Sequence, residues 1–165
     1  MAKKVKQEKR EIFDIGAVAQ YFALSIIFAL LVFGVNFVVR MALEASPTGQ
    51  CGNGILTIYE VHNTGAAFNL FAGQPEMLIG ASVLTVLAIM FSDFVFSAKL
   101  SSASIAPLAL LTAGISMNTF ERITNGYVFD YIQCNFIPDF PVFNTADMMI
   151  VIGAICLVFS VFSRR

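Results

Sequence analysis

The sequence has few charged residues for its length, and this scarcity excludes most classes of soluble protein. Lysine, arginine, aspartate and glutamate together make up 13% of the 165 residues, whereas hydrophobic residues make up 58%. Soluble domains carry about 25% charged residues, and a chain this short could not bury so much apolar surface away from water. Intrinsic disorder is excluded as well, because disordered chains are poor in apolar residues. The composition therefore predicts a membrane protein.

Other absences narrow the chemistry of the protein. The net charge is −1, which gives no electrostatic reason to expect a nucleic-acid partner. Histidine occurs only at His62, and no cluster of histidine, cysteine and carboxylate residues has the spacing of a zinc site. The sequence also has neither a glycine-rich phosphate loop nor a nucleophile elbow. A metalloenzyme or a nucleotide-binding protein is therefore unsupported, and His62 is interpreted as an incidental loop residue.

Long apolar runs predict four transmembrane helices. Residues 15–39 carry no charge over 25 positions, and as a helix they would measure about 38 Å, enough to cross a hydrocarbon core of about 30 Å. A cleaved signal peptide is the alternative for this run, but the run is too long for one and further apolar runs follow it. The predicted spans cover about residues 15–40, 77–98, 103–120 and 143–162.

The positions of the basic residues predict the orientation, because lysine and arginine collect on the cytoplasmic side of a membrane. With four spans, eight of the ten basic residues fall on the same side as both termini, which are therefore expected to be cytoplasmic. Residues 41–76 and 121–142 are then expected to face outward. In the first of these segments, residues 55–62 have the pattern of a strand and follow a turn-rich stretch at residues 49–54, so a short strand or a hairpin on the membrane surface is expected. In the second, residues 127–132 are strand-like.

Two aspartates lie where a membrane protein rarely carries charge. Asp147 lies about one turn into the fourth predicted helix, just after Asn144 and Thr145, either of which can cap that helix. An ionisable residue at the mouth of a span is costly and is therefore a functional candidate. A simpler interpretation is that Asp147 complements the positive end of the helix dipole. Asp130 favours a functional role, because it lies 17 positions earlier in an apolar strand on the same outward side.

Two carboxylates in a water-poor setting suggest a specific chemistry. They cannot both ionise cheaply, so one keeps a proton while the other acts as a base. Such a pair can activate a water molecule and protonate a leaving amine, which is the chemistry of an aspartic protease. The spacing of Asp130 and Asp147 does not force them into contact, so the sequence suggests the pair only. A third carboxylate, Asp93, lies near the cytoplasmic end of the second span and is interpreted as an interfacial residue.

Three motifs together resemble those of the bacterial lipoprotein signal peptidases, also called signal peptidase II. They are NTGAAF at residues 63–68, the end of the third span continuing into the strand GYVFDY over residues 114–131, and FPVFNTAD at residues 140–147. Their order and spacing also agree with the family. Each motif alone would be a weak signal, but the combination is specific and covers most of the chain.

The resemblance implies a membrane all-α fold in which four transmembrane helices carry a small periplasmic β-cradle, as one peptidase domain over residues 1–165. It implies an intramembrane aspartic endopeptidase of the bacterial cytoplasmic (inner) membrane, with its active site facing outward. Members of the family remove signal peptides from diacylglyceryl-modified prolipoproteins by cutting before the lipidated cysteine. The implied partners are therefore these substrates and membrane lipid, and no metal or organic cofactor is expected.

The same resemblance assigns roles to individual residues. Asp130 and Asp147 are expected to be the catalytic pair. The residues expected to support the site or bind substrate are Asn63, Gly65, Asn118, Arg122 and Asn144.

Several positions depart from the family pattern. Asn36 and Arg40 stand where the first helix usually carries an aspartate and, four positions later, a lysine, and arginine does not replace lysine conservatively. Glu121 stands in place of an aspartate, and Met117 in place of a small glycine that favours close helix packing. Asn69 stands where a small residue is common. These departures concern the surroundings of the two aspartates and leave both aspartates in place.

Two other functions remain open at this point. A non-catalytic homologue that binds lipopeptides or lipid is supported only by the departures at Asn36, Glu121 and Met117, and the presence of both aspartates argues against it. A small transporter could use the same aspartates as a path for protons or ions. Four spans are few for a transporter, however, and the sequence shows no inverted repeat.

The cysteines leave one structural question open. Cys51 and Cys134 fall in the two outward segments, and Cys156 falls in the fourth span. A Cys51–Cys134 disulfide is chemically allowed on the oxidising outer side of a bacterial membrane. Two unpaired thiols are favoured, because the sequence does not show whether the two Cα atoms lie within about 7 Å.

Overall fold

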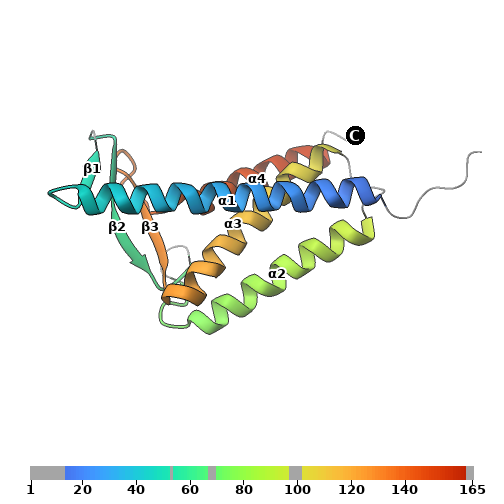
Figure 1. The fold of residues 1–165 in the computed structure, drawn as a ribbon, viewed down its shortest axis with the longest axis horizontal. Coiled ribbons are helices and arrows are strands. Elements are labelled where there is room, and N and C mark those ends of the chain that lie inside the picture. The colour runs from blue at the N-terminus through green and yellow to red at the C-terminus, as the bar shows by residue number, and fades with distance from the viewer. Residues whose placement is uncertain (1–13, 53, 67–69, 97–101, 163–165) are drawn as a thin grey trace, which may run out of the picture.

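The computed structural model describes residues 14–52, 54–66, 70–96 and 102–162, and these form a helical bundle with a small sheet at one end (Figure 1). Most of the basic residues used to predict the orientation lie outside the described residues, as does part of the NTGAAF motif. In chain order, the elements are α1 (Ile15–Ala45), β1 (Gln50–Gly52), β2 (Leu56–Asn63), α2 (Pro75–Phe96), α3 (Ser102–Asn125), β3 (Val128–Cys134) and α4 (Thr145–Phe162).

Among these elements, three helices are long and apolar enough to cross a membrane: α1, α2 and α3. Helix α4 is also apolar but shorter, with 18 residues. Helices α1 and α3 continue to Ala45 and Asn125, past the ends predicted near residues 40 and 120. The predicted ends fell at the charged residues Arg40 and Glu121. In the structure, these two side chains form an ion pair near the sheet, and both helices continue past them. The prediction of a mostly helical membrane fold with a small sheet is confirmed.

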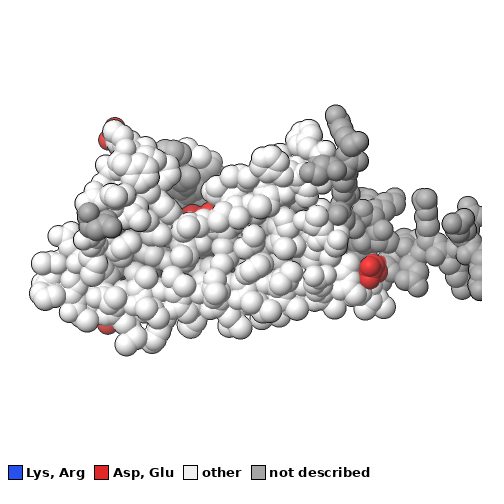
Figure 2. Space-filling model, turned by 90° about the horizontal axis from the view of Figure 1, so that it is seen from above, with Lys and Arg blue, Asp and Glu red and all other residues white. Residues whose placement is uncertain are grey.

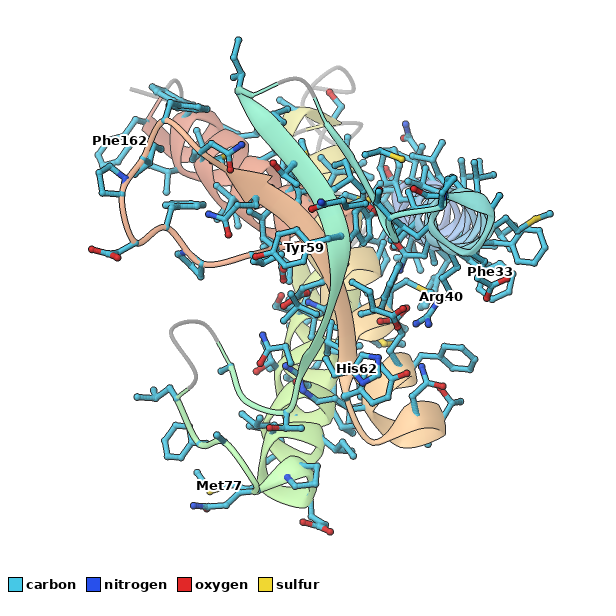
Figure 3. The ribbon with its side chains drawn as sticks, turned by 90° about the vertical axis from the view of Figure 1, so that its left-hand side faces the viewer. Phe33, Arg40, Tyr59, His62, Met77 and Phe162 are labelled. Carbon is cyan, nitrogen blue, oxygen red and sulfur yellow. The ribbon has the colours of Figure 1, made fainter. Side chains whose placement is uncertain are left out.

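The helices expose large apolar side chains. On α1, Leu30 and Phe33 are 64% and 53% exposed, and Phe33 points away from the other elements (Figure 3). Figure 2 shows a face that is almost free of charged atoms along the helices. An exposed apolar surface of this extent fits contact with lipid.

Helix α3 occupies the centre of the bundle and packs against α1, α2 and α4. At the end away from the sheet, Tyr21 of α1 and Leu108 of α3 are buried together, with Leu157 of α4 packed against them. The first turns of α1 and the last turns of α4 therefore lie at the same end of the molecule (Figure 1). Asp93 of α2 is only 1% exposed, whereas the sequence suggested no more than an interfacial residue near the end of the helix. The inward-facing side of α2 places this carboxylate inside the bundle.

Close packing of α3 against α4 depends on glycine. A Cβ atom added at Gly114 would lie 2.5 Å from the carbonyl oxygen of Ala146 and 2.7 Å from Cγ1 of Ile150. The carbonyl oxygen cannot move freely, because it belongs to the backbone of α4. Glycine at this position therefore allows the first turn of α4, which carries Asp147, to approach α3.

We expect Gly114→Ala to destabilise the fold by about 1–3 kcal/mol through overpacking. Gly80→Ala on α2 is the matched control, because a Cβ there meets nothing within 4 Å. Alanine is the better helix former, so this control should be neutral or stabilising by up to about 1 kcal/mol. Thermal unfolding of the two variants in detergent measures the difference. Equal unfolding temperatures would contradict the packing argument.

The three strands form an antiparallel sheet in the order β1-β2-β3. Strands β2 and β3 occur where the sequence predicts them, but β1 lies within the stretch predicted to be turn-rich. That stretch contains Gly49 and Gly54 with positive φ angles of 65° and 87°, so its turns flank a strand of only three residues. An irregularity between Ile58 and Val61 shifts the register of β2, and beyond it Val61 pairs with Asp130.

The sheet also answers the question of the disulfide. Cys51 and Cys134 are both free. Cys51 pairs with Ile58 on one edge of β2, and Cys134 pairs with Leu56 on the other. Because neighbouring strands lie about 4.8 Å apart, the two cysteines are separated by about 10 Å or more, beyond the reach of a disulfide.

Candidate active site

Asp130 of β3 and Asp147 of α4 lie in one cavity. The cavity has a volume of about 940 Å³ and lies between the sheet, the end of α3 and the start of α4. Asn63, Asn118 and Arg122 also line it. Figure 2 shows acidic atoms at the floor of a hollow between two raised parts of the surface. The fold therefore brings together two carboxylates that the sequence placed 17 positions apart.

Asp130 is 2% exposed and held by two amides. Its Oδ2 accepts a hydrogen bond of 2.8 Å from Nδ2 of Asn63, and its Oδ1 accepts one of 2.9 Å from Nδ2 of Asn144. Burial raises the pKa of Asp130 to about 7, and the nearby charge of Asp147 also raises it. The two amide hydrogen bonds and the charge of Arg122 act in the opposite direction. Burial outweighs these two effects, so the pKa of Asp130 lies well above that of a free aspartate.

Asp147 and Asn144 form a reciprocal cap at the start of α4. The backbone N–H of Asp147 donates to Oδ1 of Asn144 at 2.9 Å, and the backbone N–H of Asn144 donates to Oδ2 of Asp147 at 3.1 Å. This is a capping box, so the interpretation of Asp147 as a helix-terminus residue describes its geometry. The same carboxylate also accepts a 2.7 Å hydrogen bond from Nδ2 of Asn118 and lines the cavity. The two interpretations of Asp147 are therefore compatible.

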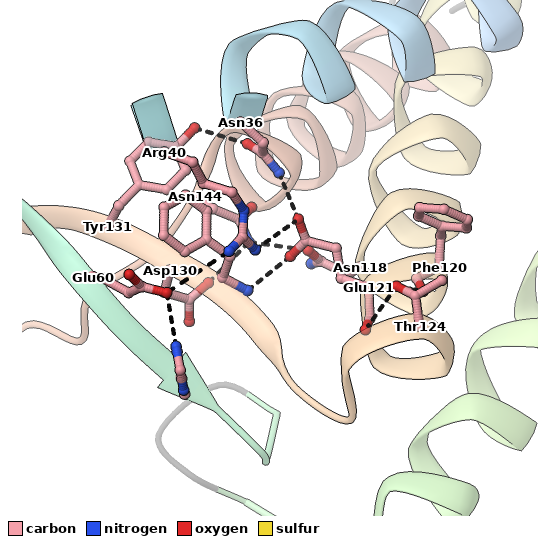
Figure 4. Close-up of polar contacts among 12 residues, drawn as sticks. Asn36, Arg40, Glu60, Asn118, Phe120, Glu121, Thr124, Asp130, Tyr131 and Asn144 are labelled. Atoms are coloured by element: carbon pink, nitrogen blue, oxygen red, sulfur yellow. Dashed lines mark hydrogen bonds and ion pairs between the residues drawn. The ribbon is translucent and has the colours of Figure 1, made fainter. Parts of the chain in front are cut away.

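One buried amide connects the two carboxylates. Asn144 is fully buried, and its Nδ2 donates to Oδ1 of Asp130 at 2.9 Å and to Oδ1 of Asn118 at 3.0 Å (Figure 4). Because Asn118 contacts Asp147 and Asn144 contacts both aspartates, a displacement of either amide would alter both carboxylates. The spacing of the pair is thus set by side chains of α3 and β3 and of the residue that caps α4.

The remaining predicted residues tie the segment after β2 to α3. A terminal guanidinium nitrogen of Arg122 donates to the carbonyl oxygen of Gly65 at 2.7 Å. The backbone N–H of Gly65 donates to Oδ1 of Asn63 at 2.9 Å. This leaves Nδ2 of Asn63 aimed at Asp130. All five residues expected to support the site therefore lie around the two aspartates.

His62 also lines the cavity. Its ring is stacked on Tyr127, with the ring centroids 3.7 Å apart, and its Nε2 lies 2.7 Å from Oε1 of Glu60. Figure 3 shows His62 on β2 and Arg40 extending from α1 on the same side. His62 therefore forms part of the cavity wall and contacts Tyr127 and Glu60 there. Within the described part of the chain, no group of three histidine, cysteine or acidic side chains could hold a metal ion.

The sequence analysis missed a second polar cluster behind the strand that carries Asp130. The hydroxyl of Tyr131 donates to Oδ1 of Asn36, and Glu121 accepts the backbone N–H of Phe129 (Figure 4). The signal was present in the alternation of the strand, since the two neighbours of Asp130 must face away from it. Their partners on α1 and α3 were not visible, because those contacts join residues far apart in the chain.

The fold and the cavity together define a class: a helical membrane protein with two carboxylates in one cavity, one on a small sheet and one at a helix start. The model of the Signal peptidase (SPase) II family matches residues 24–163, and the chain belongs to this family. The family inferred from the three motifs is therefore confirmed.

Individual relatives agree with this assignment. The lipoprotein signal peptidase of Dehalococcoides mccartyi is 40% identical over 117 residues, which cover 68% of this chain and 71% of that protein. The lipoprotein signal peptidase of Moorella thermoacetica is 29% identical over 136 residues, which cover 80% of this chain and 88% of that protein. A bacterial membrane enzyme solved by the in meso method at 2.3 Å has a similar fold, with a TM-score of 0.75 and 22% identity over 88% of both chains.

Proposed function

We propose that the chain is an aspartic endopeptidase that removes signal peptides from prolipoproteins, with Asp130 and Asp147 as its catalytic pair. Membership of the signal peptidase II family makes it a signal-peptide-removing protease. The aspartic type is inferred from one observation: two carboxylates share a cavity, and Asn144 contacts both of them. Asn63, Gly65, Asn118, Arg122 and Asn144 are proposed to hold the pair and the substrate.

The pair would act with one proton between its two carboxyl groups. The ionised carboxylate takes a proton from a water molecule, and the resulting hydroxide attacks the scissile carbonyl carbon. The protonated carboxyl group gives its proton to the leaving nitrogen as the peptide bond breaks. The protonated state near neutral pH belongs to the pair as a whole, because the two groups are coupled. The elevated pKa of Asp130 supports a shared proton at that pH.

The two alternative functions are less well supported. A non-catalytic lipopeptide-binding homologue would not need two carboxylates in one water-poor cavity. A transporter would need a polar path along the bundle, whereas the hydrogen bonds of Asp130 and Asp147 join them to residues at the sheet end, Asn63, Asn118 and Asn144. The departures at Asn36, Glu121 and Met117 lie behind the strand or within the helix packing, and the aspartates keep their amide partners.

We also propose the arrangement in the membrane. Helix α4 is proposed as a fourth span, with both termini cytoplasmic and the sheet on the outer side of the bacterial cytoplasmic membrane. The common position of the first turns of α1 and the last turns of α4 supports an even number of crossings. The single helical bundle around α3 supports one peptidase domain over the whole chain.

The cavity also suggests how substrate is chosen. Beyond Asp147 its wall continues along α4 with Met148, Val151 and Ile152, which are 43%, 56% and 47% exposed. An apolar wall that leads from the carboxylates toward the lipid-facing side of the helices suits acyl chains. We therefore propose diacylglyceryl-modified prolipoproteins as substrates, cut just before the lipidated cysteine.

The proposed function is tested with purified protein and a synthetic diacylglyceryl-modified prolipoprotein peptide. Mass spectrometry should find cleavage immediately before the modified cysteine. Binding of the peptide without any cleavage would instead support the non-catalytic homologue.

The pair should also give the reaction a defined pH dependence. Asp130 has a pKa raised to about 7 by burial, so the shared proton is present below that pH and lost above it. We expect kcat/KM to fall about tenfold per pH unit on the alkaline side. Arg122 lowers the pKa of Asp130, so in Arg122→Gln the alkaline limb should move to higher pH. A rate that stays constant on both sides of neutral pH would contradict a shared proton.

A further inference from the structure

Strand β2 loses its outer neighbour at the point where it reaches the cavity. Strand β1 pairs with β2 no further than Tyr59 (Figure 1). Beyond the register irregularity, β2 continues from Val61 to Asn63 against β3 alone. Within the described residues, no other strand covers the side of β2 that faces away from β3. We call this side of residues 60–63 the open edge of β2.

The pairing with β3 determines which backbone groups face the open edge. His62 pairs with Phe129 of β3. The backbone N–H of Phe129 donates to Glu121, so it points away from β2, and His62 and Phe129 exchange no backbone hydrogen bonds. A residue of an antiparallel strand that does not bond its neighbour on one side presents its N–H and C=O to the other side. The backbone N–H and C=O of His62 therefore face the open edge.

His62 is also an exposed residue of the cavity wall. Its imidazole already contacts Glu60 and Tyr127. In the part of the chain that the structure describes, no backbone hydrogen bond outside the strand pairing involves His62. A strand edge with unpaired N–H and C=O groups is a template for another extended chain. The open edge of β2 therefore offers a place for such a chain beside the cavity.

The opposite edge of the sheet is already occupied. Glu121 accepts the backbone N–H of Phe129 at 2.7 Å. The carbonyl oxygen of Phe143 accepts the N–H groups of Tyr131 at 3.1 Å and of Ile132 at 2.8 Å. Strand β1 has an outer edge as well, but its three residues are not among those that line the cavity. The open edge of β2 is thus the edge of this sheet from which an extended chain can enter the cavity.

The position of the sheet selects the part of the precursor that reaches it. The apolar wall proposed for the acyl chains runs along α4, on the helical side of the cavity. An apolar signal peptide belongs beside the helices for the same reason. The chain that follows the cysteine leaves the membrane, so it is the part of the precursor that extends toward the sheet.

We propose that the chain after the lipidated cysteine binds as an added strand on β2, with one of its residues hydrogen-bonded to both backbone groups of His62. The proposal rests on the proposed function, since the bound chain belongs to the same prolipoprotein. Neighbouring strands lie about 4.8 Å apart, so the added strand lies about 10 Å from β3, a distance that about three extended residues span. The paired residue is therefore expected about three positions after the cleavage site. Such pairing recognises the backbone and accepts many sequences after the cysteine.

The test compares two substitutions at His62. His62→Pro removes the backbone N–H, and proline is tolerated where a strand edge has no partner. His62→Ala is the reference, because it lacks the same imidazole and keeps the N–H. On a lipidated peptide with five residues after the cysteine, KM should be about three- to tenfold higher in His62→Pro than in His62→Ala, with similar kcat, because one hydrogen bond is lost from the bound substrate. On a lipidated peptide that ends one residue after the cysteine, the two variants should have equal KM.

A second measurement uses the wild-type protein, so it does not depend on the folding of His62→Pro. N-methylation of each of the first four residues after the cysteine removes one peptide N–H at a time. Successive N–H groups of an extended chain face opposite edges. KM should therefore rise for one of two neighbouring positions and stay unchanged for the other.

The outcomes separate the added strand from its alternatives. A KM difference between His62→Pro and His62→Ala that is equally large on the short peptide would overturn the added strand, because the loss would then come from local distortion. Equal KM values on the long peptide would overturn it as well, since the imidazole or neither group would then bind the chain. A scan without any sensitive N-methyl position would have the same consequence.

A wild-type protein that cleaves neither peptide would overturn the proposed function instead. Binding of the fluorescently labelled long peptide to His62→Pro and His62→Ala in detergent, followed by fluorescence polarisation, would then still test the added strand. Weaker binding to His62→Pro would support it, and equal binding would overturn it.

Discussion

Asp130→Asn and Asp147→Asn should each lower the rate of precursor cleavage by at least about a thousandfold. Each substitution keeps the size of the side chain and removes the group that exchanges a proton. Asp130 accepts hydrogen bonds on both of its oxygens, from Asn63 and Asn144, and an asparagine can accept on only one side. The loss should appear in kcat and in kcat/KM together, because the missing interaction is one made in the transition state.

The matched control is Asp139→Asn. Asp139 lies in the same segment between β3 and α4, is exposed, and has a positive φ angle of 57°, a conformation that asparagine also adopts. This variant should cleave at the wild-type rate. All three variants should reach the membrane in equal amounts, as measured by immunoblotting of membrane fractions. Near-normal turnover by either Asp130→Asn or Asp147→Asn would refute the assignment of the catalytic pair.

Local patterns in the sequence predicted the elements that carry these aspartates. The strand-like run around Asp130 and the apolar run from about residue 143 follow from alternation and hydropathy, which depend on neighbouring residues only. The position of strand β1 was not predicted for the same reason, since a three-residue strand between glycine turns has no pattern of its own. Its existence depends on its pairing with β2.

Contacts between distant residues were harder to predict. The hydrogen bond between Asn36 and Glu121 joins residues 85 positions apart, and nothing in either local sequence points to the other. Asp93 was placed at the interface because it lies near a helix end, whereas the packing of α2 on α3 determines its burial. The neighbourhood of Asp130 and Asp147 could be expected only through the family resemblance, because spacing along the chain does not fix distance in space.

Substrate lipidation should have the second large effect. A precursor that lacks the diacylglyceryl group should be cut at least about a hundredfold more slowly than the lipidated one. Burial of about four methylene groups at about 0.8 kcal/mol each supplies about 3 kcal/mol, which corresponds to about a hundredfold in kcat/KM. The apolar side chains of Met148, Val151 and Ile152 along the cavity wall provide a surface for such burial. Equal rates on the two precursors would argue against acyl-chain recognition by this wall.

Two valines on the same helix test where the acyl chains lie. Val151 lines the cavity and is 56% exposed, whereas Val158 is 53% exposed and is not part of the cavity wall. Val151→Asn should lower kcat/KM for the lipidated precursor about tenfold, because a polar group then faces the chain, and should have little effect on the unlipidated one. Val158→Asn introduces the same polar group seven positions further along the helix and should leave the preference for lipid unchanged. If both variants lost the preference to the same extent, the acyl chains would not lie in the cavity beside Asp147, and the discrimination would have to come from the bilayer as a whole.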